Sequence, residues 1–351
     1  MVAFSGSLID SLEYEKESMI PGKTILVTGA TGFLGKIFVE KILRVQPDVK
    51  KLYLLLRASN SCSAAERMHN EIIGKDLFKV LRDKLGDDFD SFISEKVMAV
   101  AGDVSSENLG IRDVNLRKAM LEEIDIVLHS SASTKFDERF DVAMCTNTIG
   151  ALNVVNFAKN CIRVEILLHV SIAYVCGEAE GLVLEKPFQM GQTLIGFSKL
   201  DIHFEKKAKE HGWPNTYVFT KAMGEMLVEH TKENLPIVIV RPTIISSTYK
   251  EPFPGWIEGV RTLDSFAIAY GKSKLTCFPR DIDAIVDVTP ADMVVNTIIM
   301  AMVANANQCY DNIYHVGFSI RNPLRYINLS DYAHKYFREA MDRQRWEAYQ
   351  G

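Results

Sequence analysis

Continuous apolar runs alternate along the chain with segments in which apolar residues recur at helical spacing. The runs cover residues 24–27, 52–56, 96–103, 124–129, 166–170 and 237–240. Short runs rich in β-branched residues and leucine are typical of strands buried on both faces of a sheet. Helical spacing is found at residues 36–45, 64–92 and 147–160. Strands that alternate with helices predict an α/β fold with a parallel, doubly wound sheet and right-handed crossovers.

A glycine-rich turn joins the first run to the first helical segment. It reads Thr28-Gly-Ala-Thr-Gly-Phe-Leu-Gly-Lys36. Gly29 allows a tight turn, Gly32 allows backbone N–H groups to approach a pyrophosphate, and Gly35 allows the helix to pack close to the strand. The helix N-terminus carries a partial positive charge that favours an anion. Strand, glycine turn, helix and strand together predict the first βαβ unit of a Rossmann-type dinucleotide-binding domain.

The end of the second predicted strand indicates which dinucleotide is bound. An NAD site usually carries an acidic residue there, which accepts hydrogen bonds from the ribose hydroxyls. This chain carries Arg57 at that position, and Lys36 follows the third glycine. A cation at the strand end suits a 2′-phosphate, so we expect NADPH. The alternative is that both cations are solvated surface charges.

Composition excludes several classes of protein. The chain has 351 residues, of which 47% are hydrophobic and 24% charged, and its formal net charge is -5. That balance is ordinary for a globular protein and gives no reason to expect nucleic-acid binding. The six cysteines form no C-x-x-C pair, so we expect neither a metal site nor a disulfide framework. No apolar run reaches the roughly 18 residues of a membrane-spanning helix, so any membrane contact is expected to be peripheral.

The chain is expected to have four parts. Residues 1–20 are predicted to be a loose leader, and their acidic residues argue against a signal or transit peptide. Residues 21–245 hold the predicted dinucleotide-binding domain. Residues 246–329 form a smaller substrate-side lobe with strands that return to that domain. An amphipathic helix is predicted from Ser330 to Ala348, within a helical segment at residues 330–351.

Polar residues occur at the carboxyl ends of later strands and inside them. Asp103 ends the third strand, where it could accept a hydrogen bond from the adenine amino group or could be a plain turn residue. The fourth strand runs into residues 130–134, whose small side chains would let the backbone lie along the ribose and nicotinamide. His129 and His169 lie within apolar runs, so we interpret them as core histidines rather than catalysts.

Tyr217 and Lys221 carry the predicted chemistry. They are four residues apart at the start of a predicted helix that follows Pro214, so their side chains share one helix face. A free tyrosine has a pKa of about 10. A nearby ammonium should lower that pKa, so that Tyr217 exchanges a proton near neutrality. Lys221 could also hold the ribose hydroxyls. The same spacing suits an ordinary amphipathic helix, but beside the glycine turn it favours a reductase.

The chain resembles the extended short-chain dehydrogenase/reductase family and, more closely, the plant alcohol-forming fatty acyl-CoA reductases. The broader resemblance rests on the glycine turn and on Tyr217 with Lys221. The closer one rests on segments spread over nearly the whole chain, which are Phe136-Asp-Glu-Arg139, Leu168-His-Val-Ser171, Ala173-Tyr-Val-Cys-Gly-Glu178, His211–Glu225, Arg241-Pro-Thr243, Glu251-Pro-Phe-Pro-Gly-Trp-Ile-Glu-Gly259 and Pro290-Ala-Asp-Met-Val-Val-Asn296. The segment from Glu251 to Gly259 is especially specific, because bare cofactor binding does not require it.

The resemblance implies a reaction and a location. NADPH would deliver a hydride to the thioester carbonyl of a long-chain fatty acyl-CoA, and the hemithioacetal would expel the CoA thiol. A second NADPH would reduce the resulting aldehyde to a primary fatty alcohol, as in the biosynthesis of wax and suberin lipids. The resemblance also implies the cytosolic face of the endoplasmic reticulum.

The resemblance further implies roles for individual residues. Tyr217 would protonate the developing alkoxide, and Lys221 would tune Tyr217 and hold the ribose. Asn147 would support a proton-relay water, unless it is only a helix-start residue. Ser171 and Ile172 would lie beside the tyrosine at the reacting oxygen. The implied cofactor-binding residues are Thr28, Gly29, Thr31, Gly32, Phe33, Leu34, Gly35, Arg57, Asp103, Ser131, Ala132, Lys221, Pro242 and Thr243, and the segment Arg241-Pro-Thr243 would line the nicotinamide pocket.

Two departures from the family pattern concern whole segments. Relatives carry a further helical domain, whereas this chain stops at Gly351, so residues 330–351 are interpreted as the start of a truncated segment. The stretch between Ser171 and Tyr217 is shorter than in relatives. It includes residues 188–194 and 201–209, which we expect on the acyl side of the site.

A third departure concerns one side chain. Relatives carry a hydroxyl residue at the position of Ile172, where it would bind the substrate oxygen. Successive strand residues face opposite sides, so we expect Ser171 and Ile172 to point apart and Ser171 not to replace that hydroxyl. Weak turnover or none is therefore expected.

Three hypotheses remain open from the sequence. The leading one is an NADPH-dependent long-chain acyl-CoA reductase. The second is a reductase of another carbonyl or thioester on the same fold. The third is a folded NADPH-binding protein without turnover.

Overall fold

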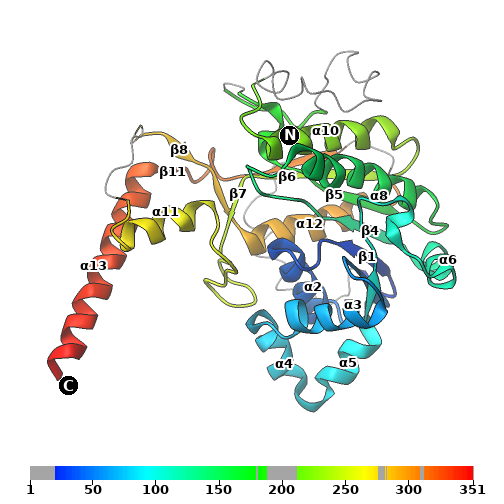
Figure 1. Cartoon of the computed structure of the whole chain (residues 1–351), viewed down its shortest axis with the longest axis horizontal. Helices are drawn as coiled ribbons and strands as arrows, with labels where there is room; N and C mark the ends of the chain where they lie inside the picture. The colour runs from blue at the N-terminus through cyan, green and yellow to red at the C-terminus, as the bar shows by residue number, and fades with distance from the viewer. Residues whose placement is uncertain are drawn as a thin grey trace.

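Seven parallel strands form the central sheet of the protein, which confirms the predicted Rossmann-type α/β fold (Figure 1). The computed structural model describes residues 20–178, 181–187, 212–275, 281, 283–308 and 312–350, with side chains up to residue 339. The strand order is β10-β6-β5-β4-β1-β2-β3, and every neighbouring pair is parallel. The strands are β1 (Thr24–Thr28), β2 (Lys51–Leu56), β3 (Val97–Ala101), β4 (Ile126–His129), β5 (Ile166–Val170), β6 (Ile237–Pro242) and β10 (Asn312–Val316).

Helices cover both faces of this sheet. Alternate strand residues supply the two apolar layers, so that Ile25 and Val27 pack on one side and Leu26 on the other. The first layer is covered by α2 (Phe33–Val45), α3 (Ser61–Met68), α4 (Lys79–Leu85), α5 (Phe89–Lys96) and α12 (Ala291–Asn305). The second is covered by α6 (Val114–Glu123), α8 (Gly150–Lys159) and α10 (Thr216–Thr231).

Two predicted helical segments are interrupted in the structure. The segment at residues 64–92 is divided among α3, α4 and α5 by the turns His69–Ile73, Asp76–Phe78 and Gly86–Asp88. Gly86 ends α4 with a φ of 56°, a conformation that glycine adopts without strain. The segment at residues 147–160 begins as a π-helical turn, Met144–Ile149, between α7 (Phe140–Ala143) and α8. π-Helical turns are frequent at functional sites.

A smaller lobe follows β6. It contains β7 (Ile244–Ser246) paired with β9 (Val288–Pro290), and β8 (Ile285–Val286) paired with β11 (Leu324–Arg325). Helix α11 (Thr262–Gly271) contacts α13 (Tyr326–Gln350) through the rings of Tyr270 and Phe337, and α13 extends away from the sheet (Figure 1). Helix α13 begins at Tyr326, ahead of the predicted Ser330, and β10 and α12 pack with the main sheet although they fall within residues 246–329.

Some predictions fall outside the described residues. These are the leader, apart from Ile20, and the acyl-side residues 188–194 and 201–209. Among the residues that the structure describes, no helix combines the length and the apolar character needed to cross a bilayer.

Candidate active site

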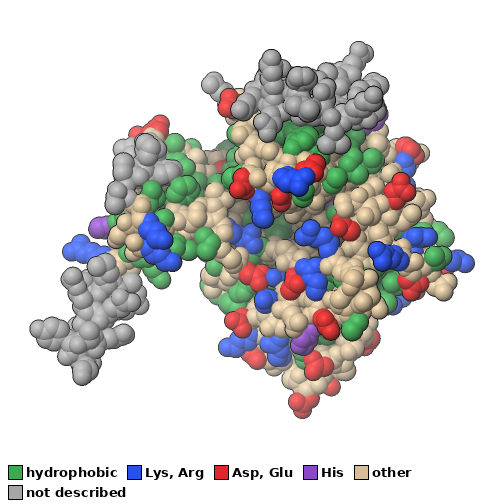
Figure 2. Space-filling model, in the orientation of Figure 1, with side chains coloured by type: hydrophobic (Ala, Val, Ile, Leu, Met, Phe, Trp, Pro, Cys, Tyr) green, Lys and Arg blue, Asp and Glu red, His purple; other side chains and the backbone are tan. Residues whose placement is uncertain are grey.

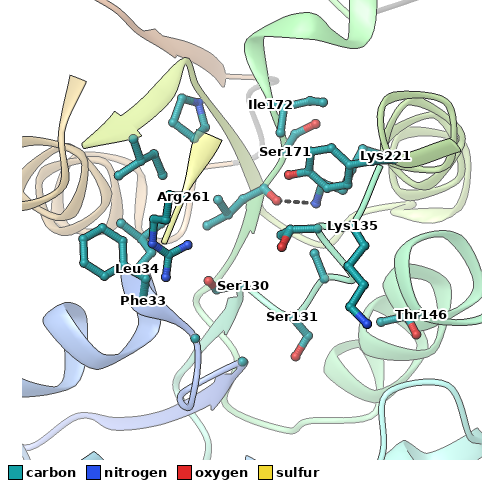
Figure 3. A pocket seen from close by; sticks show the side chains of 18 of the residues that line it. Phe33, Leu34, Ser130, Ser131, Lys135, Thr146, Ser171, Ile172, Lys221 and Arg261 are labelled. Atoms are coloured by element: carbon teal, nitrogen blue, oxygen red, sulfur yellow. Dashed lines mark hydrogen bonds between the residues drawn. The ribbon is translucent and has the colours of Figure 1, made fainter. Parts of the chain in front are cut away.

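A cavity of about 1160 Å³ lies at the carboxyl ends of the sheet strands, where doubly wound folds bind their ligands (Figures 2 and 3). Figure 2 shows it as a hollow near the centre of one face, bordered by Lys and Arg side chains. Its walls combine the glycine turn, the ends of β2, β4, β5 and β6, the start of α10 and the beginning of α11. Segments far apart in the sequence therefore meet in one chamber.

The glycine turn is packed as the sequence predicts. Gly29 has a φ of 77°, and a Cβ there would lie 2.7 Å from backbone atoms of Ser130 and Ser131. A Cβ on Gly35 would overlap the carbonyl oxygen of Gly29. Gly32 is the N-cap of α2 and supplies no side-chain cap, so the first-turn N–H groups lack an intrahelical partner at the cavity wall. The turn thus offers an uncapped helix N-terminus to an anion.

Most predicted cofactor-binding residues line the cavity. They are Gly29, Thr31, Gly32, Phe33, Leu34, Arg57, Asp103, Ser131, Ala132, Lys221, Pro242 and Thr243. Thr28 and Gly35 do not line it. The Thr28 side chain is fully buried and shares a hydrogen bond of 2.8 Å with Nδ1 of His129. These two residues can shape the turn, but they do not face a ligand in the cavity.

Two arginines meet at the end of β2. Arg57 is exposed and lines the cavity beside Arg67 of α3. Arg67 donates to both carboxylate oxygens of Glu71, at 2.6 and 2.8 Å, and to the carbonyl oxygen of Arg57 at 2.5 Å. The sequence did not single out Arg67, because its i,i+4 spacing from Glu71 is typical of an ordinary surface ion pair.

Asp103 is a turn residue that also lines the cavity, and its contact with an adenine amino group stays a prediction. It lines the cavity, yet its Oδ1 accepts from the backbone N–H and the hydroxyl of Ser105, at 2.9 and 2.8 Å. These bonds form the local turn that aspartate often stabilises.

Two basic side chains that the sequence placed near the cofactor, Lys36 and Arg241, do not line the cavity. Lys36 is 4% exposed and forms an ion pair with Glu258, so it adds no free charge to the cavity. Arg241 is buried and paired with Glu225, and its Nη2 also donates to the carbonyl oxygen of Lys186 at 3.0 Å. Pro242, at the end of β6, and Thr243, which follows it, line the cavity, whereas the Arg241 side chain turns to Glu225 and does not. The expectation that Arg241 lines the nicotinamide pocket is wrong.

Tyr217 and Lys221 share the cavity, as their spacing predicts. Asn215 begins α10 by accepting from the N–H of Val218 at 3.0 Å, which places Tyr217 in the first turn and Lys221 one turn later. The Lys221 ammonium is buried and donates to the carbonyl oxygen of Val170 at 2.6 Å (Figure 3).

Burial shifts the pKa values of both side chains, and the shift of Tyr217 is opposite to the one predicted. Burial raises the pKa of Tyr217 to about 12, whereas the sequence predicted a decrease caused by Lys221. Burial also lowers the pKa of Lys221 to about 8, although the Glu225 carboxylate partly opposes that change. Desolvation disfavours the charged form of each group and is the largest cause of both shifts. Tyr217 is consequently a protonated phenol at neutral pH and can act as a proton donor.

Ser171 and Ile172 line the same cavity as Tyr217, and Figure 3 shows both of them near Lys221. Ile172 also packs in an apolar cluster with Val175 and Trp213. The Ser171 hydroxyl is buried and has no hydrogen-bond partner among the described residues. Strand β5 ends at Val170, so strand alternation does not continue through Ser171 and Ile172, and both residues reach the wall. The expectation that Ser171 does not replace the missing hydroxyl stays a prediction.

Asn147 does not line the cavity. Its side chain accepts from the N–H of Ser133 at 2.8 Å and donates to the Ser133 carbonyl at 3.0 Å and to the Thr220 hydroxyl at 2.9 Å. It therefore ties the loop after β4 to α10. A role in binding a relay water stays a prediction.

The two histidines are core residues, as interpreted from the sequence. His129 and His169 are 1% and 0% exposed, and their ring centroids are 5.1 Å apart. Burial, reinforced by Lys221, lowers the pKa of His129 to about 3, so this ring is neutral at physiological pH.

Comparison with known proteins agrees with this geometry. The model of a family described as male sterility protein matches residues 27–298. The chain is 51% identical over 345 residues to fatty acyl-CoA reductase 1 of Arabidopsis thaliana, covering 90% of this chain and 70% of the relative. It is 50% identical over 364 residues to the alcohol-forming fatty acyl-CoA reductase of Simmondsia chinensis, covering 95% and 72%. The terminal R domain of the myxalamid pathway superposes with a TM-score of 0.68 at 20% identity, covering 90% of this chain and 70% of that domain.

Proposed function

The chain belongs to the family of male sterility proteins and plant fatty acyl-CoA reductases, and from that membership we propose that it reduces long-chain acyl-CoA thioesters with NADPH. The observation that carries the proposal is the single cavity that joins the α2 N-terminus to Tyr217 and Lys221. A dinucleotide on the glycine turn would extend toward these two side chains, of which Tyr217 would donate a proton and Lys221 would hold the ribose.

The proposed reaction assigns each proton. NADPH, when bound, would supply the hydride that the carbonyl carbon accepts, and Tyr217 would give its phenolic proton to the developing alkoxide. The hemithioacetal then breaks its C–S bond, and the CoA thiol leaves with a proton. A second hydride and a second proton convert the aldehyde into a primary alcohol. Lys221 would hold the ribose, and Ser171 offers a buried hydroxyl beside the reacting oxygen.

NADPH is proposed over NADH because of the cations at the end of β2. Arg57 lines the cavity and has no acidic partner within the part of the chain that the structure describes, and Arg67 lies beside it. Losing a charge-assisted hydrogen bond costs roughly 1.5 to 3 kcal/mol. We expect Arg57→Ala to weaken NADPH binding about tenfold to a hundredfold and to leave NADH binding nearly unchanged. Equal losses for both dinucleotides would refute the assignment.

The decisive experiment tests turnover directly. Purified protein is incubated with NADPH and acyl-CoAs of graded chain length, with small ketones as alternative substrates, and products are identified by mass spectrometry. Aldehyde or alcohol from long-chain acyl-CoA would support the proposal. Reduction of the ketones alone would favour another carbonyl reductase on the same fold.

One observation favours a second candidate function. Ile172 places an apolar side chain at the wall where a hydroxyl is expected in relatives, so this chain could bind NADPH without turnover. Tight NADPH binding with no product from any acyl-CoA would support that candidate. The location at the cytosolic face of the endoplasmic reticulum stays a prediction from the family resemblance.

A further inference from the structure

Arg261 is a cation of the cavity wall that the predicted cofactor site does not include. It follows the loop that leaves β7 and is the N-cap of α11, and it lies on the lobe side of the cavity. Its guanidinium carbon is 4.2 Å from the centroid of the Phe33 ring, at the first residue of α2. A residue of the lobe therefore rests directly beside the N-terminus that faces a dinucleotide.

The guanidinium of Arg261 has no hydrogen-bond partner among the described residues. Its Nε is buried and unpaired, while its backbone N–H donates to Asp264 at 3.2 Å. The nearby carboxylate of Glu258 is bound by Lys36 and lies 3.6 Å from Lys75. A guanidinium carries five N–H donors in a planar fork, and leaving such donors unmatched in a partly buried site is costly.

Stacking on Phe33 orients this fork. Arginine packs its planar face on aromatic rings, which leaves the N–H groups at its edge available. Figure 3 shows Arg261 directed into the cavity beside Phe33 and Leu34, across from Ser130. The uncapped first turn of α2 borders the same space, next to Arg261. Two sources of positive charge thus face one gap from the two lobes.

We propose that Arg261 binds the pyrophosphate of the dinucleotide and completes, from the lobe side, the anion site begun by the N-terminus of α2. A pyrophosphate carries two negative charges, and planar N–H pairs match its oxygens in a bidentate manner. The inference rests on the proposed function, because it requires a dinucleotide in the cavity. It also links the cofactor to α11, whose Ser265 and Phe266 line the same cavity.

The test separates the pyrophosphate from the 2′-phosphate by equilibrium binding to the full chain, measured by calorimetry. NADPH contains both groups, NADH only the pyrophosphate, and adenosine 2′-monophosphate only the 2′-phosphate. Arg261→Ala should weaken NADPH and NADH alike, about tenfold to a hundredfold, and leave adenosine 2′-monophosphate unchanged. Arg57→Ala should weaken the binding of adenosine 2′-monophosphate and leave the binding of NADH unchanged. Lys272→Ala is the matched control, because Lys272 is an exposed cation at the end of α11 outside the cavity wall.

A second variant guards against misfolding. Arg261→Gln keeps a planar end group over Phe33 but removes the charge, so it should lose affinity like Arg261→Ala while its thermal unfolding matches that of the parent. Unchanged NADH binding in both variants would overturn the inference and leave the proposed function standing. Coenzyme A is measured as a further ligand. If the Arg261 variants lose affinity for coenzyme A but not for NADPH or NADH, the inference is also overturned, because Arg261 then binds the pyrophosphate of the substrate. A parent protein that binds neither NADPH nor NADH would refute the proposed function together with the inference.

Discussion

Lys221→Met should stabilise the cofactor-free protein at neutral pH while removing a residue that the proposed reaction needs. Lys221 is 3% exposed, and burial lowers its pKa from 10.5 to about 8. Each pKa unit corresponds to about 1.4 kcal/mol, so protonating this buried amine at pH 7 costs the folded state about 3 kcal/mol.

The substitution has a cost that offsets part of this gain. The Lys221 ammonium donates to the carbonyl oxygen of Val170 at 2.6 Å, and methionine leaves that oxygen without its donor. Leaving a buried acceptor without its donor costs about 1 to 3 kcal/mol. Methionine has a similar length and no charge, so it should fill the space. We expect a net stabilisation of at most about 2 kcal/mol at pH 7.

The pH dependence distinguishes this effect from simple repacking. Between pH 8 and 10.5 the unfolded parent binds more protons at Lys221 than the folded parent, so parent stability gains from this residue as pH rises. The variant lacks that gain, and its advantage should shrink across the same window. Other groups with shifted pKa values, such as Cys161, whose pKa burial raises to about 12, affect the pH dependence of stability equally in both proteins.

Urea unfolding at intervals from pH 7 to 10.5 measures the difference in free energy of unfolding. Lys118→Met is the control, because the Lys118 side chain is 77% exposed and its replacement should change stability little at any pH. A Lys221→Met protein that is less stable than the parent by a constant amount across the window would refute the reasoning. That result would mean that burial of the ammonium carries no appreciable cost.

Three further predictions concern the site and its support. Tyr217→Phe keeps the ring and removes the proton donor, so turnover should fall by roughly two to four orders of magnitude with NADPH affinity retained; equal activity would reject Tyr217 as the acid. Ile172→Thr should raise turnover by about a hundredfold to a thousandfold without tightening NADPH, because it restores a donor at the reacting oxygen, whereas Ile172→Val should not. If Ile172→Thr has no effect while Ser171→Ala abolishes turnover, Ser171 is the donor. Glu225→Ala leaves Arg241 buried without its carboxylate and should destabilise the protein by about 3 to 5 kcal/mol in urea unfolding; a loss below about 1 kcal/mol would contradict this.

Local patterns in the sequence were sufficient for the architecture and for the main groups of the site. A strand buried on both faces is largely apolar, so the isoleucine, leucine and valine residues of β5 predict a buried strand. Gly29 and Gly35 indicate close backbone contacts because no other residue fits there. Spacing of four along a helix places Tyr217 and Lys221 on one face without any knowledge of the rest of the fold.

The tertiary structure decided which of these groups face a ligand and how they are charged. Lys36 meets Glu258, 222 residues away, and Arg261 stacks on Phe33, and neither partner follows from a local pattern. The pKa of Tyr217 rises rather than falls because burial disfavours the charged phenolate, and desolvation depends on all the segments that surround a group. The sequence therefore determined periodic and local features, whereas partner choice and proton affinity were set by contacts between segments that only folding brings together.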